Sequence, residues 1–142
     1  MQKIEINDVV TLLRNLLTPR FSLLTGGAFF LLMVAIGAIP GEATGLAAKI
    51  PDKLLHFIAY SFLACCIHRS LNCGLLSRAV RTVMIVGVLG ALDENIQRFM
   101  PYRSCDLKDW IFDLLAAFFS VVVLSFILAI VSPKVKASSR TI

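Results

Sequence analysis

Four long apolar runs constrain the fold of this chain more than any other feature. The first, Phe21 to Ile39, contains no charged residue over 19 positions. A helix needs roughly 20 apolar residues to cross the hydrocarbon core of a bilayer. Three further runs have a similar length, namely Leu54–Leu71, Ala79–Gln97 and Trp110–Val131. We therefore predict an all-α, polytopic membrane protein whose four spans form one transmembrane four-helix bundle.

Composition excludes several other classes of protein. The chain is 58% hydrophobic and 16% charged, whereas soluble domains average about 45–50% apolar and about 25% charged residues. This excludes a disordered chain, a disulfide-stapled secreted module and a soluble nucleic-acid binder. The formal net charge of +5 does not imply a nucleic-acid partner, because basic residues in a membrane protein are first of all topology signals.

The segments on either side of the spans have patterns of their own. Residues 1–20 carry apolar side chains at helical spacing, which predicts a cytoplasmic amphipathic helix lying on the membrane surface. A docked soluble helix is the alternative. A cleaved signal peptide is less favoured, because its apolar region of about 7–15 residues is shorter than the first run. We predict a single membrane domain over residues 21–131 and a basic cytoplasmic tail over 132–142.

Basic residues predict the orientation. They gather before the first span, between the second and third, and after the fourth: Lys3, Arg14, Arg20, Arg69, Arg78, Arg81, Lys134, Lys136 and Arg140. Because Lys and Arg are retained on the cytoplasmic side, both termini are expected in the cytoplasm.

With this topology, the polar ends of three spans fall at one level, in the outer third of the bilayer. A carboxylate within the hydrocarbon costs about 2.5–3.5 kcal/mol, so such groups face the bundle interior and find partners. We predict one shared ligand-binding cluster. The same residues could instead have purely structural roles. The charges near the interface would then be solvated, His56 would only pack, and Asp113 would pair with Lys53 or Arg103. The predicted cluster comprises Lys53, His56, Tyr60, Asp93, Glu94, Gln97, Arg103, Asp106, Asp109 and Asp113.

Two motifs within this cluster resemble those of a known family. The segment from Asp52 to Tyr60, DKLLHFIAY, looks like the second-helix signature of the VanZ-like family of membrane proteins. A second segment resembles the other signature of that family. It consists of Asp93-Glu94-x-x-Gln97 followed by Phe99, Pro101, Arg103, Ser104, Asp106 and Asp109. The resemblance covers roughly residues 50–120. The chain departs from the family where an Asn and a Gly are usual, since it has Asp113 and Ala116.

The resemblance implies a bacterial cytoplasmic-membrane protein of the cell envelope, in a family associated with glycopeptide resistance. Our first hypothesis is binding or handling of an anionic envelope lipid or lipid-linked precursor, with Arg103 and Lys53 holding a phosphate and Arg98 as a further candidate.

Two other hypotheses stay open. The first is a membrane-embedded hydrolase or transferase, in which His56 acts as general base with Asp93, Glu94 or Asp109. The second is a structural or regulatory subunit whose cluster only fixes helix register. The sequence has no metal signature with two spaced histidines, no Ser nucleophile motif and no Gly-rich phosphate loop. In the enzyme hypothesis the same residues could hold a divalent metal, since imidazole and carboxylate suit Zn²⁺ and Mn²⁺. Without a recognised signature, we assign no metal or other cofactor.

Overall fold

The computed structural model describes residues 18–40, 45, 51–101, 103 and 106–138, the last eleven by their backbone alone. These residues form four helices: α2 (Pro19–Gly37), α4 (Asp52–Ser70), α5 (Leu75–Gln97) and α6 (Leu107–Ser138). The prediction of an all-α chain is confirmed. The amphipathic helix predicted over residues 1–20 lies outside the described residues up to position 17, and the last two of its positions belong to α2.

Local capping explains where the helices begin. Thr18 precedes α2, and its Oγ1 accepts a hydrogen bond from the backbone N–H of Phe21 at 3.3 Å. Pro19 follows as the first helical residue, where its missing N–H costs nothing. At α6, Oδ1 of Asp106 accepts from the N–H of Lys108 at 2.9 Å. This cap starts α6 at Leu107, earlier than the predicted start of the fourth span.

The predicted stop at Ser132-Pro133 is wrong, because α6 continues to Ser138. A proline removes one intrahelical hydrogen bond, but its fixed φ is helical. The backbone therefore passes through Pro133, and part of the predicted basic tail extends α6.

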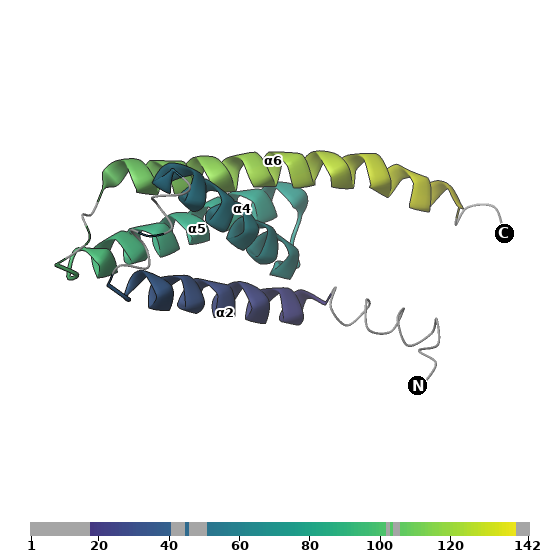
Figure 1. Cartoon of the computed structure of the whole chain (residues 1–142). Helices are drawn as coiled ribbons and strands as arrows, with labels where there is room; N and C mark the ends of the chain where they lie inside the picture. Colours follow the sequence, from purple (N-terminus) through teal and green to yellow (C-terminus); the bar gives the residue numbers. More distant parts are fainter. Residues whose placement is uncertain (1–17, 41–44, 46–50, 102, 104–105, 139–142) are drawn as a thin grey trace, which may run out of the picture.

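The helices alternate in direction around α4. The start of α2, the end of α6 and the α4–α5 connection lie at one end of the bundle. The end of α2, the start of α4, the end of α5 and the start of α6 lie at the opposite end (Figure 1). α4 packs against α2, α5 and α6, and α5 also packs against α6, whereas α2 packs mainly on α4. α4 is therefore the central helix, and α2 is attached to one of its sides.

Three helical segments are long and apolar enough to cross a membrane: Pro19–Gly37, Leu75–Gln97 and Leu107–Ile127. α4 is less apolar, since it contains His56, His68 and Arg69. Its central position explains the difference, because a helix surrounded by other helices can direct polar side chains toward protein instead of lipid. The chain is a multi-pass membrane protein.

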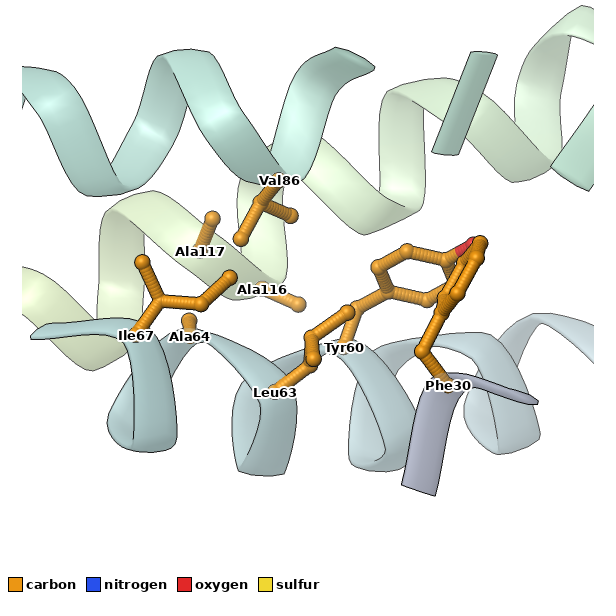
Figure 2. Packing of buried hydrophobic residues seen from close by; sticks show 8 residues of the cluster. All are labelled: Phe30, Tyr60, Leu63, Ala64, Ile67, Val86, Ala116 and Ala117. Atoms are coloured by element: carbon orange, nitrogen blue, oxygen red, sulfur yellow. The ribbon is translucent and has the colours of Figure 1, made fainter. Parts of the chain in front are cut away.

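The surface and the interior support this assignment. Large apolar side chains are exposed on the outside of the bundle, with Leu24 71%, Val88 68% and Phe118 63% exposed. The apolar core is small and joins all four helices, as Figure 2 shows. Its members are Phe30, Tyr60, Leu63, Ala64, Ile67, Val86, Ala116 and Ala117. An apolar exterior around a partly polar interior suits a hydrocarbon solvent.

Candidate functional site

Polar side chains of α4, α5 and α6 are buried together at the end of the bundle where α4 and α6 begin. Burial in this region is nearly complete, with exposed fractions of 0% for Asp113 and 8% for His56. Asp93, Glu94, Gln97 and Asp109 are each 5% exposed. Buried ionisable groups in a membrane need partners. The partners divide into a set between α4 and α6 and a set around α5.

Between α4 and α6, the contacts form a ladder of basic and acidic side chains. Nδ1 of His56 lies 3.0 Å from Oδ1 of Asp113. Nζ of Lys53 lies 3.3 Å from Oδ1 of Asp109 and 3.6 Å from Oδ2 of Asp106. The ladder forms because 53 and 56 lie one turn apart on α4, as do 109 and 113 on α6. Asp113 thus pairs with His56, and the alternative pairing with Lys53 or Arg103 is wrong.

Around α5, three acceptors are occupied by neighbouring donors. The hydroxyl of Tyr60 donates to Oδ2 of Asp93 at 3.2 Å. Oε2 of Glu94 accepts the backbone N–H of Asp106 at 2.9 Å. Oε1 of Gln97 accepts from two nitrogens of Arg103, at 3.2 Å from Nε and 2.8 Å from the terminal nitrogen. The first contact joins α4 to α5, and the other two tie the α5–α6 connection back onto α5.

A glycine makes room for the buried carboxylate of Asp113. A Cβ placed on Gly90 would lie 2.7 Å from Oδ2 of Asp113 and 3.1 Å from Cδ1 of Trp110. Trp110 is held by its own hydrogen bond, because its Nε1 donates to the carbonyl of Gly87 at 2.9 Å. The small residues of α5 therefore allow α6 to approach with both a ring and a carboxylate in the interface.

A cavity of about 250 Å³ lies between α2 and the α4–α5 pair. Its two walls differ in chemistry. The apolar wall comes mainly from α2 and includes Phe29, Leu32, Met33 and Ile36. The polar wall comes from α4, α5 and the connection that follows α5. Besides the apolar Leu55, Ala59 and Met100, it carries the polar lining residues of the cavity: Asp52, His56, Asp93, Gln97 and Arg103. A cavity with one apolar and one polar wall matches an amphiphilic occupant.

The structure separates the ten predicted site residues into two groups. Four of them, His56, Asp93, Gln97 and Arg103, line the cavity. The other six contact them or one another but are not part of its lining: Lys53, Tyr60, Glu94, Asp106, Asp109 and Asp113. Sequence reasoning missed Asp52, which lines the cavity. Its position four residues before His56, on the same face of α4, was the available signal.

The loop carboxylate of Asp106 has a structural function. The backbone N–H of Lys108 and, secondarily, the ammonium group of Lys53 lower the pKa of this carboxyl below its ordinary value of 3.8. Asp106 therefore stays ionised at neutral pH, where it caps α6.

Chemically, the arrangement offers a histidine–carboxylate pair beside a cavity. The carboxylate in contact with His56 is Asp113, not Asp93, Glu94 or Asp109, the partners considered for a general base. Asp52, His56 and Asp109 also each place one ligand atom within 4.8 Å of the other two, a separation that a metal ion could bridge.

Comparison with known proteins gives one informative similarity. The chain is 32% identical over 89 residues to an uncharacterized protein of the fission yeast Schizosaccharomyces pombe. The match covers 62% of this chain and 55% of the yeast protein, so the chain spans little more than half of that relative. No profile of a known protein family matches the chain. No solved structure matches it either. The protein is thus a small multi-pass membrane protein homologous to a fission-yeast protein.

Proposed function

We propose that the chain crosses the bilayer four times and binds a membrane lipid in the cavity between α2 and the α4–α5 pair. The observation that carries this proposal is the division of the cavity into an apolar α2 wall and a polar wall of α4 and α5. The acyl chains of the lipid lie along Phe29, Leu32 and Met33, and its headgroup reaches Arg103. α4 spans the membrane together with the three more apolar helices, because its polar side chains have partners on α5 and α6.

Arg103 is the anion-binding group in this proposal. It is the one Lys or Arg among the described residues that line the cavity. A guanidinium can bind Gln97 and still present donors to a phosphate, because it has five N–H groups. Lys53 does not serve as the second phosphate ligand, because its ammonium group is held by Asp109 and Asp106. His56 and Gln97 contribute polar contacts beside Arg103.

The proposed orientation of the protein rests on its basic residues, and the proposed membrane rests on the resemblance to VanZ-like proteins. We place both termini in the cytoplasm and the polar end of the bundle at the outer face. A bacterial cytoplasmic membrane follows from the resemblance. The relative in fission yeast favours a phospholipid common to both lineages over a lipid-linked precursor restricted to the bacterial envelope.

Native mass spectrometry of the protein released from membrane extract tests this function. Wild type is expected to carry a phospholipid-sized adduct, and Arg103→Ala is expected to lose it. Arg98→Ala is the matched control, because Arg98 follows α5 at the same end of the bundle and is not part of the cavity lining. Equal adducts on wild type and Arg103→Ala, or a bare wild-type mass, would contradict the proposal.

A further inference from the structure

Three potential metal ligands gather near the N-termini of α4 and α6. Asp52 and His56 lie one turn apart on α4, and Asp109 lies on the facing turn of α6. Each offers one ligand atom, and the three atoms lie within 4.8 Å of one another. The side chain of Asp52 forms no hydrogen bond or ion pair with any other residue in the described part of the chain. Its carboxylate is therefore available as a ligand, and its position in the first turn of α4 also suits the helix dipole.

The histidine of this group has one ring nitrogen engaged and one free. Nδ1 of His56 lies 3.0 Å from Asp113, whereas no residue that the structure describes forms a hydrogen bond to Nε2. The side chain is only 8% exposed, but Nε2 is not among the buried polar atoms without a partner, so this nitrogen is accessible to a ligand. Histidines that bind metals usually donate their other ring N–H to a carboxylate, which fixes the tautomer. Asp113 is such a carboxylate for His56, because its Oδ1 lies next to Nδ1.

The charge of the region points to a cation. Asp93, Asp109 and Asp113 are buried carboxylates, each at most 5% exposed. Among the described residues, Asp113 is paired with His56, and Asp109 with the ammonium of Lys53, which contacts only its Oδ1 and not its second oxygen. An excess of buried negative charge is costly inside a membrane bundle, and a divalent ion would compensate it.

We propose that Asp52, His56 and Asp109 bind a divalent cation, with Asp113 as a positioning residue that orients the imidazole. One imidazole nitrogen and two carboxylate oxygens suit Zn²⁺ and Mn²⁺. Three protein ligands leave coordination positions open, as in sites that accept a further ligand. Asp52 and His56 also line the cavity, so the ion is accessible from it. The sequence raised a metal only as an alternative and assigned none, because the ligands come from two helices and include one histidine.

Metal binding by the purified full chain tests the proposal without any lipid. The protein is stripped with chelator in detergent and titrated with ZnCl₂, and separately with MnCl₂, in a calorimeter. We expect one ion per chain for wild type with at least one of the two metals. For Asp113→Asn, a positioning role predicts a loss of metal affinity of about 10–100-fold. Asp52→Asn and His56→Gln each remove a ligand and are expected to lower the metal affinity at least as much.

His68→Gln is the matched control, because His68 is the other buried histidine of α4 and lies three turns away from His56. Asp52→Asn decides the outcome if His56→Gln fails to fold, since Asp52 has no hydrogen bond to lose among the described residues. Absence of stoichiometric binding in wild type would overturn the proposal. So would wild-type affinity in Asp52→Asn, or an equal loss in His68→Gln. Arg103→Ala is expected to keep the metal, which separates this site from the proposed lipid contact.

Discussion

Two adjacent glycines of α2 offer a sensitive test of how this helix packs on α4. Gly26 is buried, and a Cβ built on it would lie 2.9 Å from Cβ of Cys66. Because that atom is fixed to the backbone of α4, only a movement of α2 away from α4 relieves the overlap. Gly27 is exposed, and a Cβ built there has no neighbour within 4 Å. Gly26→Ala and Gly27→Ala therefore differ in one respect, the contact with α4.

The expected magnitude follows from this difference. Each substitution gains a similar helix-propensity term of about 0.5–1 kcal/mol, which cancels when the two variants are compared. The remaining steric term is the cost of overpacking, about 1–3 kcal/mol. We expect Gly26→Ala to unfold with a free energy lower than that of Gly27→Ala by this amount, measured by equilibrium unfolding in mixed micelles. Equal free energies of unfolding would refute the α2–α4 contact, and with it the α2 wall of the cavity.

Three further predictions concern hydrogen bonds of single polar side chains. Tyr60→Phe removes the hydroxyl that donates to the buried carboxylate of Asp93. The free energy of unfolding should fall by about 1–3 kcal/mol, and an unchanged value would show that this hydrogen bond does not form. Trp110→Phe loses the hydrogen bond to the Gly87 carbonyl and should cost roughly 0.5–1.5 kcal/mol in the same assay, whereas a gain in stability would count against the bond. Because the pKa of Asp106 is lowered from 3.8, the capping contribution is present at neutral pH and is lost as the pH falls through that depressed value. A carbon NMR titration of the Asp106 carboxyl with a midpoint at or above 3.8 would contradict this cause.

The sequence predicted the helices well because lipid solvation leaves a strong signal. The charge-free run from Phe21 to Ile39 coincides closely with α2, and the end of the third run at Gln97 is the end of α5. The starts of α5 and α6 were placed too late. Both helices extend beyond the apolar run into their connections, where a cap such as Asp106, and not hydropathy, determines the boundary.

The residues of the candidate site were predictable as a group, but their partners were not. Depth in the membrane indicated that polar groups of three helices meet at one end. It could not indicate that Asp113 contacts His56 and that Lys53 contacts Asp109, because the rotation of α4 against α6 determines those pairs. The sequence did not predict the cavity either. Its apolar wall comes from α2, whose sequence has no polar residue to mark a binding face over Phe29 to Ile36.

The central claim is that α4, the least apolar helix, crosses the membrane at the centre of a four-span bundle. Cysteine labelling from outside the cell tests it directly, in a background without the four native cysteines. Ile39→Cys and Lys108→Cys lie on exposed positions at the polar end, and Asn72→Cys lies on an exposed position after α4. The account predicts that an impermeant maleimide labels residues 39 and 108 in intact cells and labels residue 72 only after permeabilisation. Labelling of residue 72 together with residue 39 in intact cells would mean that α4 does not cross.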